Sequence, residues 1–270
     1  MDCMKASQEA DPHIVIESIS RLDQAIIIAG PAGEGRLELI LHMVKRIQMS
    51  LPTKGRPTLS SVFSTLDSPP QMPSTFSSDI PELDTAPSLA TFLMKRSRCP
   101  FILRGFVRDW PAVAAHPWSS VEYLLSVAGP GRLVPVEIGH DYRTDDWTQR
   151  LMPWDEFLGS LLPKEIDNSE PVLYLAQHDL LKQFPALRDD IEIPDYVYAS
   201  PSSPDNYPAY SPPANDDQLV INAWLGPSGT VSPAHTVRFE CHFCLLVLNP
   251  VCRILSSTYT VCYPLYTSVK

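Results

Sequence analysis

Residues 51–88 are the stretch that most constrains the fold of this chain, because they separate two segments of different character. The stretch reads LPTKGRPTLSSVFSTLDSPPQMPSTFSSDIPELDTAPS and is rich in Pro, Ser and Thr, with little hydrophobic periodicity. A segment of this composition buries too little apolar surface to offset the entropy of ordering it. We interpret it as a linker between residues 1–50 and a globular region that begins at residue 89.

The segment before the linker is predicted to form a helical hairpin. Apolar residues recur at spacings of three and four in two runs, from Ile14 to Ile26 and from Leu37 to Ile47. Between the runs, the glycines of GPAGEG (residues 30–35) break the pattern and predict a turn. The AIII run before this break could instead be a short strand.

The same turn has the Gly-x4-Gly frame of a phosphate-binding loop. That chemistry needs a Lys next, to reach the phosphates, and then a Ser or Thr for Mg²⁺. The chain has Arg36 and Leu37 at these places, and Leu cannot ligate a metal. We therefore favour a turn that connects two helices.

The region after the linker mixes helix and strand patterns, which indicates an α+β fold. Its predicted strands and helices are separated by turn residues and by a polar, Pro-rich loop at 199–217. The predicted strands are 100–106, 133–139, 171–178 and 218–227, and the predicted helices are 90–99, 118–129 and 152–162.

Composition excludes several function classes. The net charge of −10 makes nonspecific binding to nucleic acid or to an anionic membrane unfavourable. No apolar run is long enough to span a bilayer, so no membrane-spanning helix is expected. The N-terminus MDCMKASQEADPH is too polar for a secretory signal. We expect an intracellular protein of the nucleus or cytoplasm, with its six Cys mostly free thiols.

A zinc site is one alternative for the C-terminal cysteines. Cys241 and Cys244 have the Cys-x2-Cys spacing that can chelate Zn²⁺. Cys252 and Cys262 do not form a second closely spaced pair, so incidental cysteines are the simpler interpretation.

His235 is the candidate metal ligand, although a single His followed by Thr-Val is by itself usually an ordinary histidine. Fe(II) oxygenases use two His and one carboxylate, which leave open positions for cosubstrate and O₂. The first His and the carboxylate often lie two residues apart on a strand, so that both side chains point to the same side.

A family resemblance strengthens this candidate. The run from residue 87 to 236 resembles JmjC-domain proteins, and among them the lysine-specific demethylase 8 type. The pieces that carry the resemblance follow the family's order at similar spacing. They are PFILRGFVRDWPA (100–112), LVPVEIGHDYRTDDWTQRLMPWDEFL (133–158), VLYLAQHDLLKQFPAL (172–187), DIEIPDY (190–196) and INAWLGPSGTVSPAHT (221–236).

The resemblance implies an incomplete double-stranded β-helix of the cupin or jelly-roll kind, with Fe(II) and 2-oxoglutarate as cofactors. It implies a protein substrate, histone or other, for a hydroxylase or demethylase. The resemblance implies that His235 is a metal ligand and that Trp147 lies near the substrate mouth. It implies that the 2-oxoglutarate pocket is formed by Tyr174, Ser232, Asn222 and Trp224.

The resemblance breaks at Val237, where the family has Asp. Val has no lone pair for iron, and the next acid, Glu240, is off the two-residue spacing. We expect residues 89–236 to be the N-terminal part of a JmjC/cupin-like domain and residues 237–270 to be a non-homologous tail. Val-Arg can be encoded by GTA-AGA or GTA-AGG, and both begin with GTAAG, a common start of an intron. We therefore hypothesise that this tail is translated intron. A message that joins Thr236 to an Asp codon would support this.

Three readings of the chain follow from this break. In the first, the chain is a truncated, catalytically inactive form of a JmjC-type dioxygenase. In the second, the carboxylate is replaced by water or halide, as in oxygenase-like halogenases, which still requires a second His. In the third, from a different class, the chain is a noncatalytic protein-binding module.

Overall fold

The computed structural model describes part of the chain and divides it into two compact units. The described residues are 11–30, 33–51, 81–96, 101–103, 105–139, 147–162, 171–199, 208–209, 221–227, 242–246 and 253–257. Unit 1 comprises Met1–Val62, Val121–Ala186 and Asn222–Thr230, and unit 2 comprises Phe63–Ser120, Leu187–Ile221 and Val231–Lys270.

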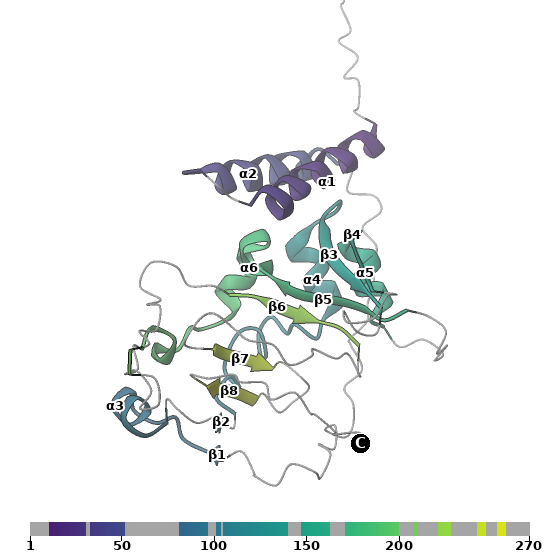
Figure 1. Cartoon of the computed structure of the whole chain (residues 1–270). Helices are drawn as coiled ribbons and strands as arrows, with labels where there is room; N and C mark the ends of the chain where they lie inside the picture. Colours follow the sequence, from purple (N-terminus) through teal and green to yellow (C-terminus); the bar gives the residue numbers. More distant parts are fainter. Residues whose placement is uncertain are drawn as a thin grey trace, which may run out of the picture. The chain divides into compact units, whose positions relative to one another are not determined.

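Unit 1 contains the N-terminal helices and a four-stranded antiparallel sheet in the order β4-β3-β5-β6 (Figure 1). Its elements are α1 (Pro12–Ala29), α2 (Arg36–Met49), α4 (Val121–Ala128), β3 (Leu133–Ile138), β4 (Thr148–Pro153), α5 (Trp154–Ser160), β5 (Leu173–His178), α6 (Leu180–Gln183) and β6 (Ala223–Leu225).

The predicted helical hairpin is confirmed. Asp11 caps α1 by accepting a hydrogen bond from the His13 N–H at 2.9 Å, and Pro12 fills the first helical position. The alternative strand for the AIII run is wrong, since α1 continues to Ala29. Three consecutive Ile residues favour a β-strand, but the helical spacing of the apolar residues decides here, because it buries Ile26 against α2.

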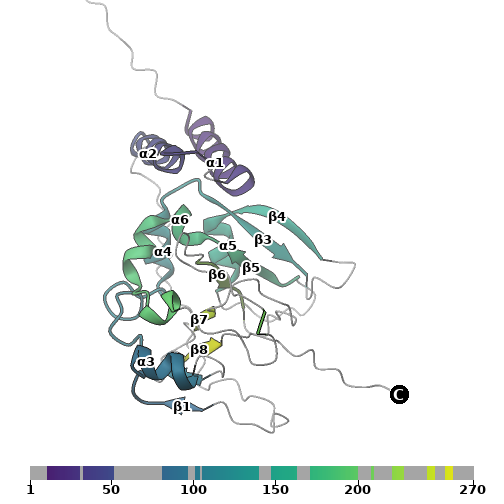
Figure 2. The same cartoon turned by 60° about the vertical axis from the view of Figure 1, so that its left-hand side comes forward.

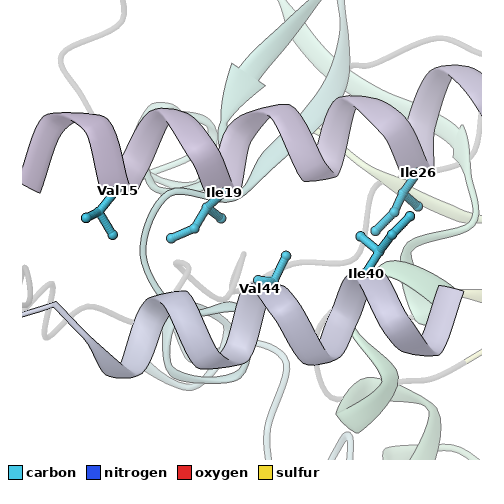
Figure 3. Packing of buried hydrophobic residues seen from close by; sticks show 5 residues of the cluster. All are labelled: Val15, Ile19, Ile26, Ile40 and Val44. Atoms are coloured by element: carbon cyan, nitrogen blue, oxygen red, sulfur yellow. The ribbon is translucent and has the colours of Figure 1, made fainter. Parts of the chain in front are cut away.

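The two helices lie side by side and share a small apolar core (Figure 2). Val15, Ile19 and Ile26 of α1 point toward Ile40 and Val44 of α2 in Figure 3. All five side chains are at most 9% exposed. Burying this stripe stabilises the pair of helices by roughly 1.5–3 kcal/mol per large side chain.

The sheet of unit 1 buries one face. Val134, Val136, Met152 and Leu175 point to this side, and each is at most 1% exposed. Helix α5 packs against β3 and β4. Its Trp154 is fully buried and donates from its indole N–H to the Leu124 carbonyl of α4 at 3.2 Å. This packing gives the sheet one face that belongs to the core.

Unit 2 contains a second four-stranded sheet, in the order β1-β2-β8-β7, with β1 and β2 parallel and the other neighbours antiparallel. Its elements are β1 (Glu82–Leu83), α3 (Leu89–Thr91), the π-helix η1 (Phe92–Arg96), β2 (Phe101–Leu103), the 3-10 helices η2 (Pro185–Asp190) and η3 (Asp195–Tyr198), β7 (His242–Leu246) and β8 (Arg253–Ser257). The first two residues of η2 belong to unit 1.

The α+β class predicted from the sequence is confirmed: the described strands form antiparallel and mixed open sheets with helices, and they do not close into a barrel. The predicted helix at 152–162 begins at Trp154, because Met152 and Pro153 belong to β4. The linker prediction at 51–88 lies mostly outside the described residues, as does the loop prediction at 199–217.

Buried polar groups organise unit 2. Asp190 is 1% exposed and accepts hydrogen bonds from His116 Nδ1 at 2.7 Å and from Trp118 Nε1 at 2.9 Å. The Tyr196 hydroxyl donates to the Pro87 carbonyl, and burial followed by the charge of Asp195 raises the pKa of this hydroxyl. The Tyr196 ring packs against Phe92 with centroids 4.8 Å apart. These bonds fix segments that are distant in sequence.

Gly129 provides the first test of this fold. It ends α4 with φ 71°, and a Cβ there would meet the Gln48 side chain at 2.6 Å. The Gln48 amide donates to the carbonyls of Ala128 and Pro130, so α2 is tied to this turn. We expect Gly129→Ala to destabilise the chain by about 1–3 kcal/mol, measured by thermal unfolding.

The matched control is Gly159→Ala, because Gly159 lies in α5 with open space at its Cβ position and no positive φ. A helical Gly→Ala change should stabilise by about 0.5–1 kcal/mol. Equal effects of the two substitutions would contradict the proposed role of Gly129.

Candidate functional site

Three of the predicted cosubstrate residues share one face of the unit 1 sheet. In register, Glu137 of β3 lies opposite Tyr174 of β5, and Leu175 lies opposite Leu225 of β6. Opposed residues point to the same side and successive residues alternate, so Tyr174 and Trp224 fall on one face. Asn222, two residues before Trp224, continues it. We call this the Tyr174 face, defined by Glu137, Tyr174, Asn222 and Trp224.

The Tyr174 face differs from the core face in burial. Leu175 points to the core and is fully buried, whereas Tyr174, Glu137 and Asn222 are half-buried. Trp224 is 47% exposed, although it is a large aromatic side chain. A face with a phenol, a carboxylate, an amide and an exposed indole can bind a polar ligand through directed hydrogen bonds.

Trp147 directly precedes β4. Extending the alternation of Gln149, which lies opposite Glu137, places Trp147 on the Tyr174 side of the sheet. Its indole N–H is buried and, within the described part of the chain, has no hydrogen-bond partner. A buried donor without a partner is unfavourable, so a ligand acceptor at this position would relieve that cost.

A half-buried histidine at the end of β5, His178, was not predicted from the sequence. The structure has a register shift between Leu175 and His178, and Gln177 has a positive φ of 52°. His178 Nε2 lies 2.7 Å from Gln183 Oε1. Burial is the largest influence on the His178 pKa and lowers it, while the Gln183 bond and the charges of Asp179 and Asp23 act in the opposite direction.

Glu137 is a second residue that the sequence analysis missed. It is the one charged residue in the otherwise apolar strand LVPVEI, and its strand neighbours Val134 and Val136 are buried. A single acid at an alternate position of such a strand is the signal that could have identified it, because strands with one buried face place such residues on the other.

The remaining predicted site residues, Ser232 and His235, lie outside the described residues, as do Val237 and Glu240. Among the residues that the structure does describe, no three His, Cys, Asp or Glu side chains come close enough to hold a metal ion. The described Tyr174 face therefore offers donors for an organic anion and no metal cluster, so the iron prediction rests on His235 and the family resemblance.

Two other candidate sites have different outcomes. The phosphate-loop alternative fails, because the turn at Gly33–Gly35 joins helix α1 to helix α2 and no strand precedes it. The zinc alternative remains a prediction: Cys244 lies in β7, and Cys241, Cys252 and Cys262 are outside the described residues.

Comparison with known proteins gives a consistent family. The model of the cupin-like domain family matches residues 90–247, a range that extends past Val237. Jumonji C domain-containing protein 5 of Drosophila melanogaster is 44% identical over 160 residues, which are 58% of this chain and 36% of that protein. Lysine-specific demethylase 8 is 40% identical over 136 residues in Danio rerio and 37% identical over 171 residues in Xenopus tropicalis.

The two demethylase matches cover 50% and 63% of this chain, and 30% and 34% of the relatives. The chain therefore matches about a third of the length of these curated relatives. In the described part of the chain, none of the helices combines the length and hydropathy needed to cross a membrane.

The lowered pKa of His178 predicts a pH dependence. The folded state binds the proton less readily than the unfolded chain, whose His has a pKa near 6.5. The stabilising contribution of His178 should be complete above pH 6.5 and decline as the pH falls below that value. Denaturant unfolding from pH 7.5 to 5 checks this.

His178→Gln is the matched variant, because its amide can still donate to Gln183 but does not titrate in this range. The variant should lose part of the pH dependence between pH 7 and 5. An unchanged slope would contradict a half-buried His178 that is neutral in the folded state.

Proposed function

We propose, since this chain belongs to the cupin-like domain family, that it is of the JmjC-type Fe(II)- and 2-oxoglutarate-dependent protein hydroxylases or lysine demethylases. We also propose that this form of the protein, which has Val237, is catalytically inactive. The observation that carries the proposal is the Tyr174 face. Tyr174 of β5 shares one side of the sheet with Asn222 and Trp224 of the β6 segment, as the strand register indicates.

Three of the four residues of the Tyr174 face suit a dicarboxylate cosubstrate, whereas the Glu137 carboxylate would repel one. The Tyr174 hydroxyl and the Asn222 amide can donate hydrogen bonds to a carboxylate, and Ser232 would add a second hydroxyl. The Trp224 indole supplies apolar surface beside them. When bound, Fe(II) and 2-oxoglutarate supply the oxidising chemistry of this family.

The same face supports a basic protein side chain as substrate. The relatives named lysine-specific demethylases act on lysine by name. A cationic side chain would be stabilised by the Glu137 carboxylate and by the aromatic face of Trp224. We infer that a protein substrate approaches from this side, with Trp147 near the entrance as the resemblance implies.

Val237 does not fit an iron site. A side chain without a lone pair cannot ligate a metal, and the resemblance expects a carboxylate two residues after His235. Glu240 is five residues from His235, and an odd spacing points the two side chains to opposite sides of an extended strand. This departure supports the proposal that this form is inactive.

Turnover is the direct test of inactivity. We expect the purified 270-residue chain, supplied with Fe(II), ascorbate and 2-oxoglutarate, to form no more succinate than a protein-free control, measured by NMR. Succinate formation that disappears in His235→Ala would overturn the inactivity while supporting the family chemistry.

Restoring the carboxylate tests the metal site separately. Val237→Asp should raise the affinity for Mn(II), used as a redox-stable substitute for Fe(II), by at least about tenfold, because a carboxylate two residues from His235 adds a hard oxygen ligand. Titration followed by EPR measures it.

Val237→Asn is the matched control, since it has similar size without the charge, and it should gain much less. The gain in Val237→Asp should vanish when His235 is also changed to Ala. No gain in any variant, in a chain that folds stably, would favour the noncatalytic binding module instead.

A further inference from the structure

A buried ion pair joins α1 to the start of β3. Asp23 is fully buried and Arg132 is 5% exposed. The guanidinium donates from Nε to Asp23 Oδ2 and from Nη2 to Asp23 Oδ1, both at 2.8 Å. It also lies over the Phe184 ring, 4.6 Å from the centroid. A planar bidentate pair of this kind fixes direction as well as distance.

The pair also completes the hydrogen bonding of β3. The Leu133 N–H donates to Asp23 Oδ2 at 2.8 Å, and the Leu133 carbonyl accepts from Gln183 Nε2 at 2.6 Å. The β3–β5 register includes only Glu137 and Ile138 on the β3 side. Where β5 has diverged, the side chains of Asp23 and Gln183 satisfy groups that a neighbouring strand would otherwise bind.

Gln183 carries the connection to β5. Its amide nitrogen is committed to the Leu133 carbonyl, so its Oε1 must accept the bond from His178. Neutral His178 is therefore protonated at Nε2. Arg132 Nη2 donates to the Gln183 carbonyl at 3.0 Å, which ties the same residue to the ion pair. The chain of contacts runs from α1 to the residue that ends β5, beside the Gln177 irregularity.

We propose that Asp23 is a positioning residue for the Tyr174 face: through Arg132, Leu133, Gln183 and His178 it sets the course of β3 and β5, which carry Glu137 and Tyr174. The N-terminal helices are then a part of the module that forms the site. What the Tyr174 face binds rests on the proposed function. How the face is held rests on the buried contacts alone.

The experiment separates positioning from stability by replacing the pair with apolar residues. Asp23→Leu combined with Arg132→Met removes both charges at similar volume, and such replacements can leave stability unchanged. The Leu133 N–H and the Gln183 carbonyl lose their partners. Backbone hydrogen exchange by mass spectrometry then compares residues 133–138 and 171–178 with residues 121–128 and 154–160.

We expect exchange to be faster by at least about tenfold in residues 133–138 and 171–178 and little changed in α4 and α5, with a thermal midpoint lowered only by the cost of the two unpaired backbone groups. The ring ¹⁵N shifts of His178 should change from the Nε2–H form to a mixture of tautomers. Uniform acceleration in all four segments, or no acceleration, would overturn the proposal.

Two further variants keep the test decisive. Glu17→Gln removes an exposed partner of Arg21 on the same helix and should leave exchange unchanged. If the double variant does not fold, Gln183→Leu removes only the bridge between Leu133 and His178 and should accelerate residues 171–178 selectively. None of these readouts uses iron, 2-oxoglutarate or a substrate, so their failure leaves the proposed function to its own tests.

Discussion

The Asp23–Arg132 pair is the interaction on which the arrangement of unit 1 depends. Removing two charges from water is expensive, and well-packed apolar side chains could hold the same helix at least as strongly. The pair adds direction: its two parallel bonds fix α1 in rotation and along its axis. A hairpin held by Ile and Val contacts alone could slide by one turn, whereas Asp23 must meet both the guanidinium and the Leu133 N–H.

Periodicity was sufficient for the elements whose sequences have a clear apolar pattern. The two helices of the hairpin, β3, β5 and β6 all lie within the predicted ranges, because their apolar spacing matches the helix or strand period. Strand β4 was missed, since its sequence TQRLMP begins with three polar residues and shows no alternation of apolar and polar residues. Its strand character comes from pairing with β3, which a local pattern does not contain.

The site was only partly predictable for a similar reason. Tyr174, Asn222 and Trp224 were predicted through family motifs, but their shared face depends on the register of β5 and β6. Asp23 had a local signal that was not used. It lies four residues after Ile19 and three before Ile26, on the buried stripe of α1. An acid at such a position requires a buried partner, although the sequence does not say that the partner is Arg132.

Building the Tyr174 face and holding a metal are separate demands on this sequence. The backbone that carries the Tyr174 face is held by contacts between residues of unit 1, among them the bonds of Leu133 to Asp23 and to Gln183. The register that brings Tyr174 opposite Glu137 belongs to β3 and β5, so we propose that Val in place of a carboxylate at position 237 costs a metal ligand and leaves this register intact. Loss of turnover would then leave a surface that still recognises the same anionic and cationic groups. For this reason catalysis and recognition have to be measured independently in this chain.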